Sequence, residues 1–149
     1  MRLLLYPLSI IYGMIATLRN SLYDYGILKS KTHNIPIICI GNLSVGGSGK
    51  TPHTNYIAKL LSPNYKVAIL SRGYGRKSSG FNYVELDSAT SAVGDEPLQL
   101  KRNNSDCIVA VNNNRNKGVE KILIDHPGTN IILLDDGFQH RRIKAGLNI

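Results

Sequence analysis

Apolar and polar residues alternate along the chain in blocks, and the short apolar blocks indicate strands. These mostly apolar runs lie at 35–41, 66–70, 107–111 and 130–134. Short runs of this kind are typical of strands that are buried on both faces of a parallel sheet. Helices are expected between them, at 53–61, 96–103 and 117–124. The alternation predicts an α/β fold with helices flanking a parallel sheet, and the final GLNI has the pattern of another buried strand.

The N-terminal block has a different pattern. Residues 3–18 carry no charge and lie between Arg2 and Arg19. This run is shorter than the roughly 20 residues of a membrane-spanning helix. Its larger apolar residues recur at alternating spacings of three and four, on Leu4, Leu8, Ile11, Ile15, Leu18 and Leu22. We therefore expect residues 1–28 to form an amphipathic helix on a membrane or a partner, or an ordinary helix that covers the core.

A glycine-rich loop, GNLSVGGSGKTP, follows the first predicted strand at 41–52 and precedes a predicted helix. This context is typical of a phosphate-binding loop, in which backbone N–H groups point at phosphate oxygens. The Lys50 ammonium would reach the outer phosphates, and the Thr51 hydroxyl would ligate magnesium. The strict pattern requires glycine where this chain has Ser44, so an incidental turn is the alternative. The predicted contacts are Ser44, Val45, Gly46, Gly47, Ser48, Gly49, Lys50 and Thr51.

Carboxylates occur at two further places where phosphoryl transfer would use them. Asp135 and Asp136 end the last long apolar run, where an aspartate can hold magnesium, although a plain turn has the same composition. The stretch GDEP places Asp95 and Glu96 before a predicted helix. A carboxylate can orient or deprotonate an attacking hydroxyl, whereas acidic residues are also common at helix starts.

The charge balance favours anionic partners. Lys and Arg outnumber Asp and Glu by 18 to 10, and the net charge is +8. The stretch SRGYGRK offers Arg72 and Arg76 to an anionic substrate, or is simply a basic loop. No nucleic-acid recognition motif is present, so nucleic acid is not an expected partner. Cys39 and Cys107 lie in apolar runs, which predicts buried, reduced thiols.

Taken together, the motifs resemble one family. YPLSIIYG, IGNLSVGGSGKTP, LSRGYGRK, VGDEP and LLDDGFQHRRI occur in this order and are similar to those of the tetraacyldisaccharide 4'-kinases, the lipid A 4'-kinases of Gram-negative bacteria. The resemblance covers nearly the whole chain, and Ser44 fits the family's version of the loop. It implies a P-loop kinase domain at 29–149 that is incomplete at its C-terminus, because family members continue further.

The resemblance also implies an activity: transfer of the ATP γ-phosphate to the 4'-hydroxyl of a lipid A disaccharide precursor, with ATP and Mg²⁺ as cofactors. It implies a monomer attached peripherally to the cytoplasmic face of the inner membrane. The implied roles are catalysis by Asp95 and Lys50, metal binding by Thr51, Glu96, Asp135 and Asp136, and substrate binding by Arg72, Arg76 and His140. Two alternatives stay open: another P-loop hydrolase or switch protein, and a truncated chain that binds nucleotide or membrane without turnover.

Overall fold

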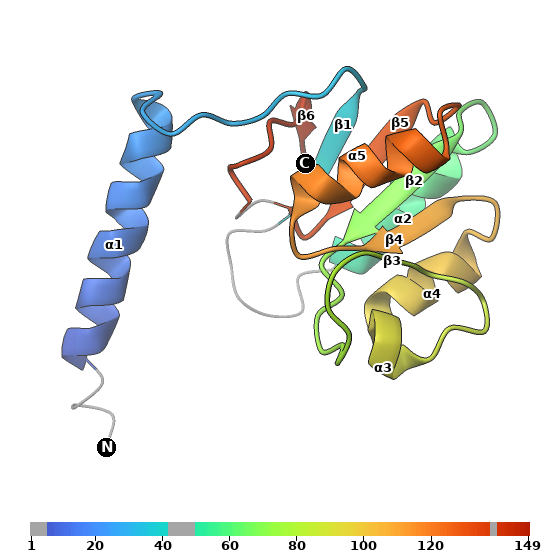
Figure 1. The fold of residues 1–149 in the computed structure, drawn as a ribbon, viewed down its shortest axis with the longest axis horizontal. Coiled ribbons are helices and arrows are strands. Elements are labelled where there is room, and N and C mark those ends of the chain that lie inside the picture. Colours follow the sequence, from blue (N-terminus) through green and yellow to red (C-terminus); the bar gives the residue numbers. More distant parts are fainter. Residues whose placement is uncertain (1–5, 42–49, 138–139) are drawn as a thin grey trace.

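A six-stranded sheet forms the centre of the protein (Figure 1). The structure is a computed structural model that describes residues 6–41, 50–137 and 140–149, with side chains from residue 13 onward. The strands, in sequence order, are β1 (Ile37–Ile40), β2 (Val67–Ser71), β3 (Asn82–Tyr83), β4 (Ile108–Val111), β5 (Ile131–Asp135) and β6 (Leu147–Asn148). Their order in the sheet is β3-β4-β2-β5-β1-β6. β3 pairs antiparallel with β4, and the other pairings are parallel.

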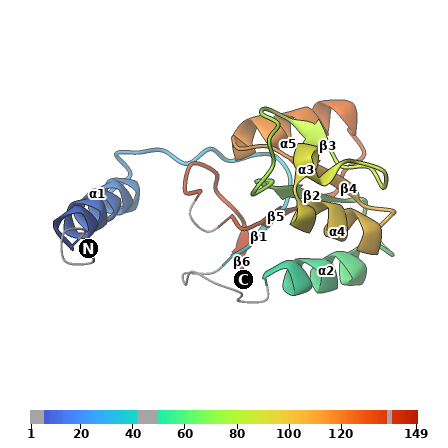
Figure 2. The same ribbon diagram turned by 90° about the horizontal axis from the view of Figure 1, so that it is seen from below.

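Helices cover both faces of this sheet. The helices of the described residues are α1 (Tyr6–Asp24), which stands apart from the sheet (Figure 1), α2 (Lys50–Leu61), α3 (Thr90–Val93), α4 (Asp95–Asn103) and α5 (Arg115–Asp125). α2 and α4 lie on one face and α5 on the other (Figure 2). The two faces bury separate apolar clusters, one including Ile69 and Leu98 and the other including Leu70 and Ile122. This two-sided burial explains why β2 and β5 are buried along their whole length.

The predicted α/β fold is confirmed, with differences at the ends of its elements. α2 begins at Lys50 rather than at residue 53, and Pro52 is tolerated because it lies in the first turn. α5 begins two residues early, because the Asn114 side chain caps it by accepting a hydrogen bond from the Lys117 N–H. GLNI contains a strand as expected, since β6 pairs with β1, but the expectation that this strand is buried is wrong, because both its residues are exposed. β3 and α3 were not predicted. Cys39 and Cys107 are buried free thiols, as expected.

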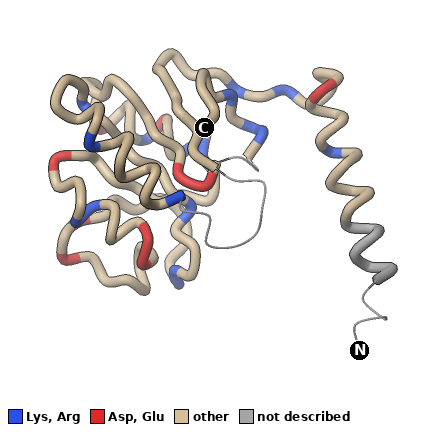
Figure 3. Tube along the Cα trace, turned by 180° about the vertical axis from the view of Figure 1, so that it is seen from behind, with Lys and Arg blue, Asp and Glu red and all other residues tan. Residues whose placement is uncertain are grey.

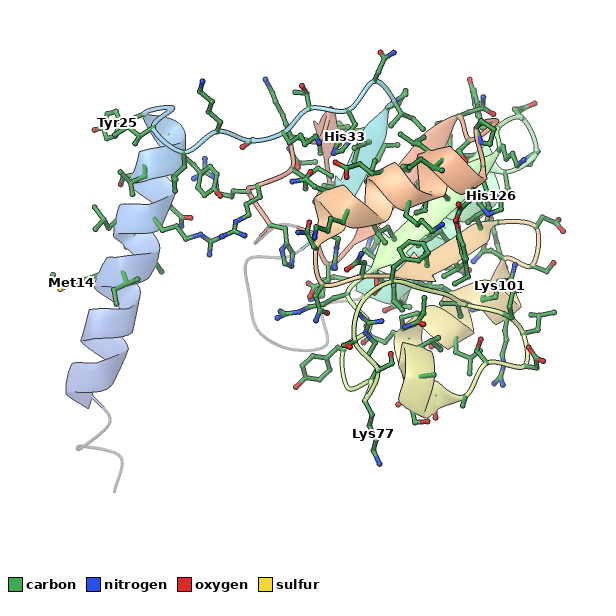
Figure 4. The ribbon with its side chains drawn as sticks, viewed as in Figure 1. Met14, Tyr25, His33, Lys77, Lys101 and His126 are labelled. Atoms are coloured by element: carbon green, nitrogen blue, oxygen red, sulfur yellow. The ribbon has the colours of Figure 1, made fainter. Side chains whose placement is uncertain are left out.

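α1 stands apart from the sheet (Figure 1). Met14, Ile15 and Leu18 are exposed by 67%, 62% and 62%, and Met14 points away from the body (Figure 4). Neither apolar cluster contains a described residue of α1. These observations count against the alternative in which this helix covers the core. Within the described residues, no helix combines the length and the apolar character that crossing a membrane requires.

One close approach between α5 and the sheet gives a testable prediction. A Cβ atom on Gly118 would lie 2.7 Å from Cδ2 and 2.9 Å from Cδ1 of Leu70, which is fully buried. We expect Gly118→Ala to lower the free energy of unfolding by about 1–2 kcal/mol, because overpacking outweighs the better helix propensity of alanine. Urea unfolding measures this loss. Gly13→Ala is the control, since no atom lies within 4 Å of its added Cβ; equal losses in both variants would contradict the packing argument.

Candidate active site

Several of the predicted site residues that the structure describes, among them Lys50, Asp135 and Asp136, gather at one edge of the sheet. Because β1, β2, β4 and β5 are parallel, their carboxyl ends share this edge, which is where open α/β sheets bind ligands. Ser71 ends β2 and Asp135 ends β5. Lys50 is the first residue of α2. Residues 42–49, which include the predicted phosphate contacts Ser44, Val45, Gly46, Gly47, Ser48 and Gly49, lie outside the described residues.

Lys50 and Asp136 form an ion pair at this edge. The Lys50 Nζ lies 2.6 Å from Asp136 Oδ1, and the two side chains are 28% and 50% exposed. The hydrogen bond to Asp136 raises the pKa of Lys50, so the ammonium stays charged. Asp136 has a φ of 53°, in the left-handed region that non-glycine residues adopt at an energetic cost. Such backbone strain clusters at functional sites, and here it turns Asp136 out of the strand toward Lys50.

Asp135 is buried directly beside this pair. Its side chain is only 1% exposed and accepts a hydrogen bond from Thr54 Oγ1 at 2.9 Å. Burial raises the pKa of Asp135, while the hydrogen bonds from Thr54 and Ser71 lower it. Arg115 is 3% exposed, and its Nη2 approaches the Asp135 carbonyl oxygen at 3.4 Å. Burial lowers the pKa of Arg115 to about 10, so the guanidinium remains a cation at neutral pH.

A third acidic segment faces the same place. Burial, followed by the charge of Asp135, raises the pKa of Glu96, and Lys50 opposes this effect. Glu96 and its neighbour Asp95 are exposed in the first turn of α4. Gly94 has a φ of 92°, and a Cβ there would lie 2.9 Å from the Tyr74 carbonyl oxygen. The glycine therefore lets the start of α4 pack closely against the basic 71–80 loop.

The three predicted substrate-binding residues have different surroundings. Arg72 is exposed and, like Arg115, lowers the pKa of His140, so its charge lies close to this imidazole. Arg76 instead turns toward its own loop, where Nη2 donates to the Gly80 carbonyl oxygen at 2.7 Å. Arg76 thus supports the loop, and its contact with a substrate stays a prediction.

Sequence reasoning missed three contributors to this site. Thr54 and Ser71 hydrogen-bond the buried Asp135, and Arg115 lies next to it. Thr54 follows the Gly-Lys-Thr motif by one helical turn, and Arg115 follows the end of β4, at the edge where the other motifs meet. These positions of Thr54 and Arg115, close to the recognised motifs, were the signal from which the sequence could have revealed the two residues. Among the described residues, no group of three or more His, Cys, Asp or Glu is arranged to hold a metal ion by itself.

A model of the family described as tetraacyldisaccharide-1-P 4'-kinase (LpxK) matches residues 1–149, the whole chain. The chain belongs to this family. The tetraacyldisaccharide 4'-kinase of Bacteroides thetaiotaomicron is 52% identical over 146 residues, which are 97% of this chain and 38% of that protein. The enzyme of the same name from Flavobacterium johnsoniae is 48% identical over 149 residues, or 100% of this chain and 44% of that protein.

A solved structure agrees with this assignment. The crystal structure of LpxK from Aquifex aeolicus, described as an "apo" form in complex with ATP, superposes with a TM-score of 0.90 and 42% identity. It covers 99% of this chain, which in turn spans 47% of that chain. The present chain therefore has the fold of the corresponding part of LpxK. It spans about two-fifths of the length of the curated relatives that it matches.

His140 makes the stability of the folded chain depend on pH in a way that can be measured. Burial first, then the charges of Arg115 and Arg72, lower the pKa of His140 from 6.5 to about 4. The unfolded chain therefore binds more protons than the folded chain between these pH values, and His140 lowers the stability as the pH falls from about 6.5 to about 4. We expect His140→Asn to flatten the dependence of urea unfolding on pH in this window.

The imidazole resonances of His140 provide the direct check, with a titration midpoint expected near pH 4. The raised pKa values of Glu96 and Asp135 act in the opposite direction, but they are common to both proteins and cancel in the comparison. Identical pH profiles for the parent and the variant would show that His140 is not shielded from protonation.

Proposed function

We propose that this chain supplies the nucleotide-binding and metal-binding part of a tetraacyldisaccharide 4'-kinase. In the proposed reaction the γ-phosphate of ATP moves to the 4'-hydroxyl of a tetraacyldisaccharide 1-phosphate, the lipid A precursor. The observation that carries the proposal is the pairing of Lys50 with Asp136, next to the buried Asp135, at the carboxyl edge of the sheet in a chain of this family.

The donor set at this edge fits ATP with Mg²⁺. Burial, and after it the charges of Asp135 and Asp136, raise the pKa of Glu96, so the three carboxylates share one electrostatic neighbourhood. Carboxylate oxygens and the Thr51 hydroxyl are the ligands that Mg²⁺ prefers. When bound, the ion would neutralise charge that develops on the β- and γ-phosphate oxygens. Lys50, already charged and held at the start of α2, would bind the outer phosphates.

Asp95 is the carboxylate that we assign to the acceptor hydroxyl. It is exposed at the start of α4, one residue before Glu96, and so lies beside the proposed metal site without being buried in it. In the reaction the 4'-hydroxyl proton passes to Asp95, the sugar oxygen forms a bond to the γ-phosphorus, and the bond from that phosphorus to the bridging oxygen breaks to release ADP.

Substitution of this base tests the proposal in a protein extended to the full length of its relatives. We expect Asp95→Asn to lower kcat by about 100-fold or more with little change in KM, because a general base acts in the transition state. Steady-state transfer of radiolabelled phosphate from ATP measures both constants. A kcat near that of the parent, with chemistry rate-limiting, would exclude Asp95 as the base.

Lys50→Ala provides the contrasting variant. Loss of a charged contact to phosphate removes about 1.5–3 kcal/mol of binding, so nucleotide affinity should fall about tenfold or more. Calorimetric titration with ATP and Mg²⁺ separates this binding defect from the catalytic defect of Asp95→Asn. No phosphate transfer to any disaccharide acceptor by the extended parent protein would refute the proposed function itself.

We propose further that α1 attaches the protein peripherally to the cytoplasmic face of the inner membrane. Support comes from the exposure of Met14, Ile15 and Leu18 on a helix that leaves the body of the protein. Basic positions gather in the linker after α1 and in the neighbouring part of the body, where acidic head groups would attract them (Figure 3). An enzyme bound in this way would meet its acylated substrate without extracting the acyl chains from the bilayer.

Flotation with anionic liposomes tests this attachment. We expect the double variant Ile15→Asp/Leu18→Asp to float poorly, because two charges enter the apolar side of the helix. The charge-matched control is Thr17→Asp/Asn20→Asp, which adds the same charge on the polar side and should float like the parent. Equal loss in both variants would assign binding to net charge rather than to the apolar side. Equal flotation of parent and both variants would contradict docking through α1.

A further inference from the structure

A polar pocket lies between α1, the start of α5 and the 140–143 segment. Its volume is about 480 Å³. Ile143 is the apolar member of the lining; the other lining residues are Arg19, Asn113, Asn114, Arg115, Asn116, His140 and Arg142. Among the described residues, no carboxylate lines it. A pocket lined by three arginines, with no acidic residue among the described lining, favours an anionic ligand.

Arg115 is the strongest sign that this pocket receives a ligand. Its side chain is 3% exposed, yet its Nε has no hydrogen-bond partner among the described residues. Nη1 donates to the Asn112 carbonyl oxygen, and Nη2 makes only a long contact of 3.4 Å to the Asp135 carbonyl oxygen. Buried donors without a partner are rare in native proteins because they lose the hydrogen bonds that water would provide. An acceptor bound in the pocket would complete the hydrogen bonding of Arg115.

Two asparagines of the lining make structural hydrogen bonds, whereas Arg142 offers a donor. Asn114 caps α5, and Asn116 Nδ2 donates to the Arg142 carbonyl oxygen at 3.0 Å, so both asparagines hold the backbone in place. His33 contacts the Asn116 side chain at 2.9 Å and fixes it further. The Arg142 guanidinium, in contrast, forms no hydrogen bond or ion pair with the described residues. It is exposed and available to a ligand.

We propose that this pocket binds a phosphate group other than the phosphates of the nucleotide. A phosphate offers several acceptor oxygens to diverging guanidinium groups, a geometry for which arginine is better suited than lysine. The pocket borders α5, whereas Lys50 opens α2 on the opposite face of the sheet (Figure 2). The two phosphate sites would therefore lie on opposite sides of the buried Asp135.

This separation matches the acceptor in the proposed function, on which the assignment of the ligand rests. The family description specifies a disaccharide that already carries a 1-phosphate. A sugar phosphate held at Arg115 and Arg142 would direct the other end of the disaccharide across the edge of the sheet toward Asp95. The phosphate of a bilayer head group is the second possible source, because Arg19 brings α1 to the same pocket.

Substitution of Arg142 tests the pocket without disturbing these structural hydrogen bonds, because the structural contacts of this residue use its backbone. The assay uses a protein extended to family length and compares acceptors with and without the 1-phosphate. We expect Arg142→Gln to lower the ratio of their kcat/KM values about tenfold, the effect of one lost charged contact. Arg102→Gln, which removes the same charge from the last turn of α4, should leave the ratio unchanged.

Two further measurements identify the source of the phosphate. Inorganic phosphate should shift the Arg115 Nε–H resonance of the 149-residue chain, with weaker binding in Arg142→Gln; this readout does not need kinase activity. Weaker flotation of Arg142→Gln than of Arg102→Gln on anionic liposomes, with an unchanged acceptor ratio, would assign the pocket to a lipid head group. The proposal would be overturned if the extended protein is active, Arg142→Gln changes neither the acceptor ratio nor flotation, and inorganic phosphate does not shift the Arg115 Nε–H resonance.

Discussion

The buried carboxylate of Asp135 ties together the elements that form the site. Its side chain accepts hydrogen bonds from Thr54 of α2 and Ser71 of β2, and Arg115 of α5 lies against its backbone oxygen. Losing a partner would leave a buried charge or acceptor unsatisfied, which costs much more than losing an exposed contact. The two helices therefore cannot shift independently at this edge, although they pack on opposite faces of the sheet.

The neighbouring Lys50–Asp136 pair has the opposite character. Both residues are partly exposed, so water and ligands can reach them and the pair can exchange partners. In the proposed reaction Lys50 would turn to phosphate and Asp136 to Mg²⁺, which replaces one charged pairing by two. A rigid buried carboxylate beside an exchangeable exposed pair gives the site a fixed frame and an adaptable ligand-binding part. The left-handed backbone of Asp136 lets two consecutive residues take these two roles, with Asp135 buried and Asp136 exposed.

The sequence predicted well those elements whose arrangement follows from the parallel sheet. Apolar runs become parallel strands, and parallel strands place their carboxyl ends together, so Lys50, Asp135 and Asp136 had to converge. The missed elements, β3 and α3, have two and four residues and carry too little pattern of their own. Tertiary contacts hold them, such as the hydrogen bond from the Lys77 N–H to the Ser91 carbonyl oxygen.

Single polar residues set a second limit to prediction. Arg115 occurs in an asparagine-rich stretch that belongs to no motif, and its importance depends on burial that only the folded structure reveals. The exposed β6 illustrates the reverse case. Its apolar pattern suits a strand covered on both sides, yet the described residues leave Leu147 51% exposed. Pattern alone indicates which residues can be buried, whereas the packing partners decide which residues are.

One side chain of the body, Arg141, connects α1 to the rest of the protein. Arg141 donates to the Asn20 carbonyl oxygen at 3.0 Å and to Asp24 at 2.6 Å, and its guanidinium lies over the Tyr23 ring. Asp24 is 63% exposed, and ion pairs of this kind contribute little to stability. The contact can therefore set a preferred orientation of α1 without fixing it rigidly. Because Arg141 lies between His140 and Arg142, a change in that orientation would move the lining of the proposed phosphate pocket, whereas the frame around Asp135 would stay in place.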